Sequence, residues 1–192
     1  MKISIVPPAH FLTSQWSGGS STQLYISPAN ATYTERNFEL RISTAKVAVM
    51  KSTFTTLPGT QRKLMILEGE INLTHNGQLS KHLKPFDVAN FSGDWKTSAI
   101  GTCTDFNVMT TGAKQSELYY LAKKAARDYK LNLKNTSNNL FLYATYGTIH
   151  LQLMDENYML KKGSLLIIEN LSVHLISINS PDGFGLVVVE AT

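Results

Sequence analysis

The chain has 192 residues, of which 43% are hydrophobic and 17% are charged, and its net charge is +4. These values are typical of a folded globular chain and exclude disordered, collagen-like and long coiled-coil proteins. No apolar run approaches the ~20 residues of a membrane-spanning helix, and Pro7 and Pro8 interrupt the N-terminal apolar stretch before a signal-peptide core can form. The single cysteine, Cys103, excludes an internal disulfide. We therefore expect a cytoplasmic protein with no membrane partner.

Short segments in which apolar and polar residues alternate recur along the chain. In the first half they are Phe38–Ser43 and Glu70–Thr74. The second half offers further strand candidates at residues 140–146, 148–153, 163–168, 173–178 and 185–190. A period of two is typical of strands with one buried face, so the sequence predicts an all-β (mostly β) sandwich or barrel.

The two halves carry a similar motif. Gly69–Leu73 and Gly147–Leu151 both read G-x-I-x-L, and each is followed at a similar distance by Leu-Lys, at Leu83-Lys84 and Leu160-Lys161. This internal similarity predicts two similar small β-barrels in which Gly69 and Gly147 take equivalent positions.

A basic segment lies between the two motifs. Its lysines and arginines are Lys114, Lys123, Lys124, Arg127, Lys130 and Lys134. Because the rest of the chain is balanced in charge, we expect a solvated basic face and no nucleic-acid partner. Residues 116–131 fit a helix by propensity and a strand by alternation, and the sequence leaves both open.

Five segments occur in an order that resembles the HutD/Ves family: Trp16–Thr22, Leu40–Ala45, Phe54–Arg62, Phe91–Asp94 and Asp105–Met109. The resemblance implies a bicupin of the RmlC-like cupin superfamily, with two cupin-type β-barrels packed side by side in one chain. It also implies a bacterial cytoplasmic protein connected with histidine utilisation or stress response. We expect residues 1–112 to form the barrel with the candidate site and 113–192 to form the second barrel, with strands exchanged between them.

Metal-using cupins carry a His-x-His pair, and this chain has none. Its histidines are scattered at His10, His75, His82, His150 and His174. An open metal site needs several imidazole and carboxylate ligands that converge in one barrel, so we expect no metal and no cofactor.

The candidate ligand-binding residues begin with two arginines. Alternation puts Arg41 and Ser43 on one face of a strand, where the guanidinium offers a planar fork to a carboxylate. Arg62 follows the turn at Pro58-Gly59, and Phe54 before that turn supplies an apolar wall. The competing interpretation of Arg41 is an outward-facing arginine, solvated or paired with Glu39.

Four further residues complete the candidate set. Asp105 and Asn107 share a face and either bind a ligand or neutralise an arginine. Trp16 lies beside a glycine pair, and Thr22 follows that pair with a hydroxyl. Cys103 has no histidine nearby in the sequence, so we do not expect a catalytic nucleophile.

Three functions remain open. The first is a metal-free bicupin that binds a small anionic metabolite as a sensor or modulator. The second is a metal-independent cupin enzyme of the isomerase or epimerase type, in which Asp105 or a histidine moves a proton. The third is a protein-interaction scaffold, favoured by a sealed apolar N-terminal barrel. A homodimer is compatible with each of them.

Overall fold

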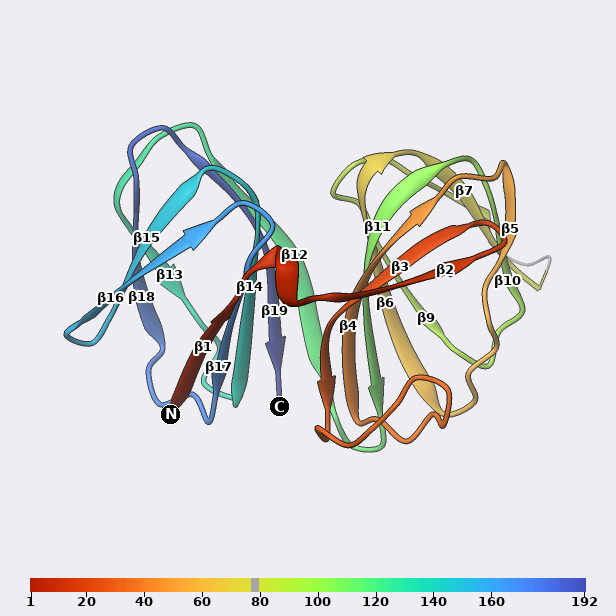
Figure 1. Ribbon diagram of the computed structural model, residues 1–192, viewed down its shortest axis with the longest axis horizontal. Coiled ribbons are helices and arrows are strands. Elements are labelled where there is room, and N and C mark those ends of the chain that lie inside the picture. Colours follow the sequence, from red (N-terminus) through yellow and green to blue (C-terminus); the bar gives the residue numbers. More distant parts are fainter. Residues whose placement is uncertain (77–79) are drawn as a thin grey trace. The chain divides into compact units, whose positions relative to one another are not determined.

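The computed structural model describes residues 1–76 and 80–192, and strands dominate them (Figure 1). The chain forms two compact units. We call Leu12–Lys114 the central unit, and Met1–Phe11 together with Gln115–Thr192 the terminal unit.

The central unit consists of two antiparallel sheets. The first has the order β2 (Leu12–Trp16), β3 (Gly19–Ser27), β4 (Leu40–Val47), β11 (Cys103–Thr111), β6 (Thr60–Gly69), β9 (Val88–Ser92). The second has the order β5 (Lys51–Thr53), β10 (Thr97–Ile100), β7 (Ile71–His75), β8 (Ser80–Leu83). Apolar side chains from both sheets form one cluster, which includes Leu64, Ile66, Leu73 and Leu83. Burial of this cluster supplies the main favourable free energy of folding of the unit.

The terminal unit has the same two-sheet plan. Its first sheet has the order β1 (Lys2–Val6), β17 (Leu165–Glu169), β14 (Asn139–Tyr146), β19 (Phe184–Ala191), β12 (Ser116–Lys123). Its second has the order β13 (Ala126–Asn132), β18 (Leu175–Ser180), β15 (Thr148–Leu153), β16 (Glu156–Lys161). A short 3-10 helix, η1 (Pro8–His10), follows β1.

The strand orders reveal a duplication. The run β4-β11-β6-β9 in one unit corresponds to β12-β19-β14-β17 in the other, and β5-β10-β7-β8 corresponds to β13-β18-β15-β16. Gly69 and Gly147 take equivalent places in this scheme, at the crossing from the first sheet to the second. Their φ angles are +76° and +83°, in the region that favours glycine, and a Cβ at either would overlap a backbone carbonyl oxygen. The repeated sequence motif therefore marks a repeated backbone geometry.

Three features differ from the sequence expectations or decide between them. Each unit is a sandwich of two sheets and not one closed barrel. The first 11 residues belong to the terminal unit, because β1 pairs with β17. Residues 116–131 are mainly strand: β12 pairs with β19 from Ser116 to Lys123, so ladder hydrogen bonds outweigh the local helix propensity.

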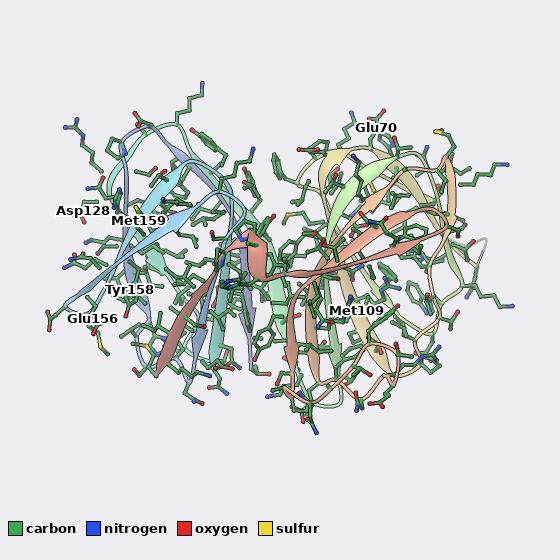
Figure 2. All side chains as sticks on the ribbon, viewed as in Figure 1. Glu70, Met109, Asp128, Glu156, Tyr158 and Met159 are labelled. Carbon is green, nitrogen blue, oxygen red and sulfur yellow. The ribbon has the colours of Figure 1, made fainter. Side chains whose placement is uncertain are left out.

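The basic segment contains local ion pairs. Lys130 lies 2.6 Å from Asp128, and Lys134 lies 3.0 Å from Glu117. Asp128 is exposed at the outer surface of the terminal unit (Figure 2), and such exposed pairs add little to stability. Within the described residues, no helix has the length and apolar character needed to cross a bilayer.

Candidate functional site

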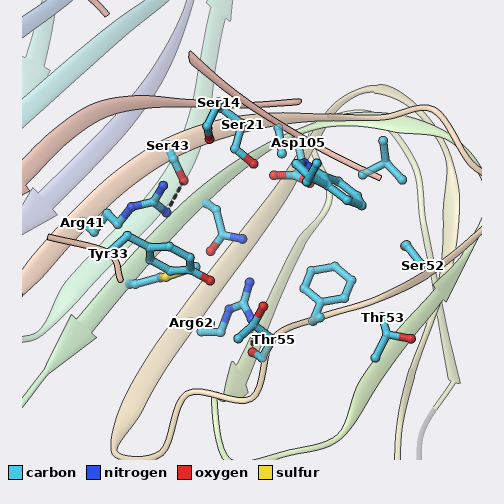
Figure 3. A pocket seen from close by; sticks show the side chains of 16 residues that line it. Ser14, Ser21, Tyr33, Arg41, Ser43, Ser52, Thr53, Thr55, Arg62 and Asp105 are labelled. Carbon is cyan, nitrogen blue, oxygen red and sulfur yellow. Dashed lines mark hydrogen bonds between the residues drawn. The ribbon is translucent and has the colours of Figure 1, made fainter. Parts of the chain in front are cut away.

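A polar cavity of about 330 Å³ lies in the central unit (Figure 3). Alternation along β4 and β11 turns every second side chain toward it. Its lining residues are Ser14, Trp16, Ser21, Tyr33, Arg41, Ser43, Ala45, Val47, Ser52, Thr53, Phe54, Thr55, Arg62, Asp105, Asn107 and Met109. The structure thus brings together seven of the eight candidate residues named from the sequence.

Arg41 projects from β4 into this cavity and is only 7% exposed. Its Nη1 donates a hydrogen bond to Ser43 Oγ at 2.9 Å, and its Nε donates one to Gln23 Oε1 at 3.3 Å. The guanidinium carbon lies 4.4 Å from the centre of the Tyr33 ring. Burial lowers the pKa of Arg41. The outward-facing interpretation of this arginine is therefore wrong.

Arg62 projects from β6 into the same cavity, as Figure 3 shows, and is 5% exposed. Its guanidinium carbon lies 5.0 Å from the ring centre of Phe54 and 5.2 Å from that of Phe91. Nη1 donates a hydrogen bond to the carbonyl oxygen of Thr55 at 3.3 Å, whereas Nε has no partner. Burial lowers the pKa of Arg62. This guanidinium is therefore held in position and still has an unused donor.

Asp105 and Asn107 lie on β11 and are 3% and 6% exposed. The Oδ1 atoms of both side chains are buried without a hydrogen-bond partner among the described residues. Burial raises the pKa of Asp105 to about 7, against an opposing effect of the Arg62 charge. Buried polar atoms without partners cost free energy, and in native proteins they often mark sites that bind a ligand or act on one.

The remaining candidates border the cavity, with one exception. The Trp16 indole folds over Gly18, where a Cβ would overlap it, and Phe54 flanks Arg62. Thr22 does not line the cavity, and its hydroxyl lies 2.8 Å from that of its cross-strand partner Thr13. Its neighbour Ser21 lines the cavity instead, since adjacent strand residues face opposite sides.

Tyr33, whose ring lies under the Arg41 guanidinium, comes from the loop between β3 and β4 and was not predicted from the sequence. Side chains in a loop do not alternate regularly between two faces, so the sequence does not predict where the Tyr33 ring points. Ser14 and Ser21 were also missed, although they are cross-strand partners on one face of the β2–β3 hairpin. The alternation of side chains along each strand, combined with the register of the hairpin, predicts that these two serines share one face.

The duplication allows a comparison of the cavity with the same place in the terminal unit. In the β6–β11 pair Leu67 has no cross-strand partner, and in the β14–β19 pair Thr145 has none. Aligning these two irregularities gives the residue-by-residue correspondence between the two units. By this register the counterparts are Leu140 for Arg62, Leu186 for Asp105 and Val188 for Asn107. All three counterparts belong to the apolar core of the terminal unit. One fold therefore carries apolar side chains at these three places in one unit and polar or charged ones in the other. The interior of the central unit is thus not the sealed, apolar one that would favour a scaffold role.

Metal-ligating side chains do not gather in the described part of the chain: no group of three or more histidine, cysteine, aspartate or glutamate residues is placed to hold an ion. The cavity holds two guanidinium groups and does not suit a cation. Burial raises the pKa of Cys103 to about 12, so its thiol is not poised as a nucleophile.

Comparison with family models gives a match to HutD over residues 9–181. The chain belongs to the HutD family. A search of curated proteins gives no match. Solved structures similar to this HutD-family chain share its fold at 10–21% identity.

The similar structures share the architecture over nearly the whole chain. A conserved protein of unknown function from Pseudomonas aeruginosa has a TM-score of 0.86 at 21% identity, covering 100% of this chain and 99% of its own. HutD from Pseudomonas fluorescens has a TM-score of 0.75 at 19% identity, and the match covers 100% of this chain and 98% of that protein. The bacterial pirin YhhW from Escherichia coli, solved with nickel(II), has a TM-score of 0.72 at 10% identity, and the match covers 98% of each chain. The cupin-like fold predicted from the sequence is confirmed.

Proposed function

We propose that this HutD-family protein binds a small carboxylate anion in the cavity of the central unit and acts as a sensor or modulator. The observation that carries the proposal is the pair of buried guanidinium groups of Arg41 and Arg62. Neither is within ion-pair distance of a carboxylate in the described residues. Buried charges without counter-ions are costly, and an anion between them offsets that cost.

The terminal unit supports the proposal by contrast. Apolar residues stand there at the places of Arg62, Asp105 and Asn107, so the sandwich itself does not require polar side chains at these positions. The polar set is therefore better explained by a ligand than by architecture. HutD from P. fluorescens was determined in a formate condition, and formate is a suitable first probe because it is the smallest carboxylate.

The biological setting that we propose is histidine utilisation in the cytoplasm. Membership of the HutD family supports the first part. The cysteine usage of the chain, with Cys103 alone and buried, supports the second.

Arg41→Lys tests the site. The variant keeps a positive charge but loses the planar fork, so we expect formate affinity to fall about tenfold, within the ~1–3 kcal/mol of a charge-assisted hydrogen bond. Both tryptophans, Trp16 and Trp95, lie in the central unit, so their fluorescence follows the titration. Arg127→Lys in the terminal unit is the matched control. Unchanged affinity in Arg41→Lys would remove Arg41 from the site.

A second candidate function is proton transfer by Asp105. It is favoured by one observation: a carboxyl group with a pKa of about 7 shares a cavity with two arginines, and general acid–base catalysis works best near such a pKa. Incubation with hydroxy and keto acids in heavy water, followed by NMR, tests it. Deuterium entering a carbon position in wild type, and not in Asp105→Asn, would support an enzyme of the isomerase or epimerase type.

A further inference from the structure

Asp105 occupies an unusual position for a carboxylate. The charge of Arg62 on β6 acts on Asp105, and Cys103 on its own strand interacts with it. Arg41 on β4 and Tyr33 on the β3–β4 loop are the other charged and titratable groups that line the same cavity. Neither arginine donates a hydrogen bond to it: Arg62 Nη1 donates to the Thr55 carbonyl oxygen, and Arg41 donates to Ser43 and Gln23. Asp105 thus lies within the field of the Arg62 charge and shares a cavity with Arg41, without a hydrogen bond to either.

Glu190 shows how this fold holds a carboxylate that has only a structural role. It is the other acidic residue that is buried in the described part of the chain, at 4% exposure. It accepts hydrogen bonds from the Tyr119 hydroxyl, the Lys134 backbone N–H and the Ser137 hydroxyl, at 2.9, 2.8 and 2.8 Å. Asp105 Oδ1 has no such donor. A carboxyl group buried without donors is better suited to the neutral acid than to the anion.

An anion in this cavity makes the ionised form of Asp105 still less favourable. Two carboxylates in one buried site repel, and one of them is then protonated. A neutral carboxylic acid is also a hydrogen-bond donor, which a carboxylate is not.

We propose, on the basis of the anion-binding function above, that Asp105 joins the complex as a neutral acid whose hydroxyl donates a hydrogen bond to the bound carboxylate, so that binding takes up one proton. The proton comes from solvent and stays on Asp105, while the ligand keeps its negative charge. The site therefore favours carboxylates, whose oxygens accept this hydrogen bond, and its occupancy depends on pH.

The surrounding groups keep this coupling in the neutral range. Burial raises the pKa of Asp105 to about 7, so protonation near neutrality costs little. The ring of His75 lies 4.8 Å from that of Phe91, centre to centre, and burial lowers the pKa of His75, which favours its neutral form. Below about pH 6 Asp105 already carries its proton, and above about pH 8 each binding event must recruit one.

The test is the formate dissociation constant of the full chain at about pH 6 and about pH 8, for wild type and Asp105→Asn. For one coupled proton and a pKa of about 7, wild type loses about tenfold in affinity across this range. Asp105→Asn, a permanent neutral donor, binds formate with the same affinity at both pH values. The exposed Asp155→Asn retains the wild-type pH dependence. Calorimetry in two buffers of different ionisation enthalpy counts the proton directly on wild type, even if Asp105→Asn does not fold.

The outcomes separate the two proposals. Formate binding that is saturable but independent of pH, or calorimetry that shows no proton uptake at about pH 8, overturns the proton coupling and leaves anion binding standing. Absence of saturable binding of any small carboxylate at either pH overturns both.

Discussion

Arg62→Met lowers the affinity of the central unit for formate by about 100-fold, or about 2.7 kcal/mol. The reason is that Arg62 is buried at 5% exposure and its Nε is a donor without a partner. Removing the guanidinium removes both the charge and the unused hydrogen bond that the proposed ligand would meet. The substitution leaves the aromatic surroundings filled, since methionine packs well against Phe54 and Phe91.

The measurement is a formate titration followed by tryptophan fluorescence, with a denaturation curve for each protein. Arg127→Met removes an arginine from the terminal unit and serves as the control for net charge. A dissociation constant of Arg62→Met within about threefold of wild type contradicts the assignment of Arg62 to the site.

Asp105→Leu stabilises the free protein by about 1–3 kcal/mol at about pH 8. The buried Oδ1 without a partner is removed, and the leucine takes the place that Leu186 holds in the terminal unit. The adjoining cavity gives room for the larger side chain. The price of this stability is the loss of the proposed proton donor to the ligand.

The pH dependence of that gain follows from the pKa of Asp105. Because the folded protein raises this pKa from 3.8 to about 7, the carboxyl group binds its proton more tightly in the folded state. Its contribution to stability is therefore fully present below about pH 4 and is lost as pH rises through about 7. Asp105→Leu does not lose this stability, so the difference in its free energy of unfolding from wild type grows between about pH 4 and about pH 7.

Urea unfolding followed by tryptophan fluorescence measures this effect, since both tryptophans report on the central unit. Asp155→Leu, at an exposed position, is expected to change stability by less than about 0.5 kcal/mol. If Asp105→Leu is less stable than wild type at about pH 8, the carboxylate is an ionised structural partner of Arg62 and not an acid waiting for a ligand.

The parts of the fold that were predictable are those with a local pattern. The G-x-I-x-L motif marked the duplication, because each copy places a glycine at a sharp crossing between sheets where a Cβ would meet backbone. Alternation placed Arg41 with Ser43, and Asp105 with Asn107, on shared faces. Whether those faces point into the unit or toward solvent becomes known only from the register of the partner strands.

The parts that were not predictable depend on contacts distant in sequence. The pairing of β1 with β17 moves the first residues into the terminal unit, and nothing within residues 1–11 indicates it. Residues 116–123 form a strand because β19 supplies a partner along their whole length. Tyr33 reaches Arg41 from a loop, where no periodicity fixes a side chain. The contrast between Asp105 and Leu186 appears only when the two registers are compared.

Equilibrium dialysis of the full chain against radiolabelled formate and succinate tests the central claim most directly. We expect one saturable site per chain in wild type, lost in Arg62→Met and kept in Arg127→Met. Saturable binding that is equal in Arg62→Met and wild type, or no saturable binding of either anion, would contradict an anion site between Arg41 and Arg62.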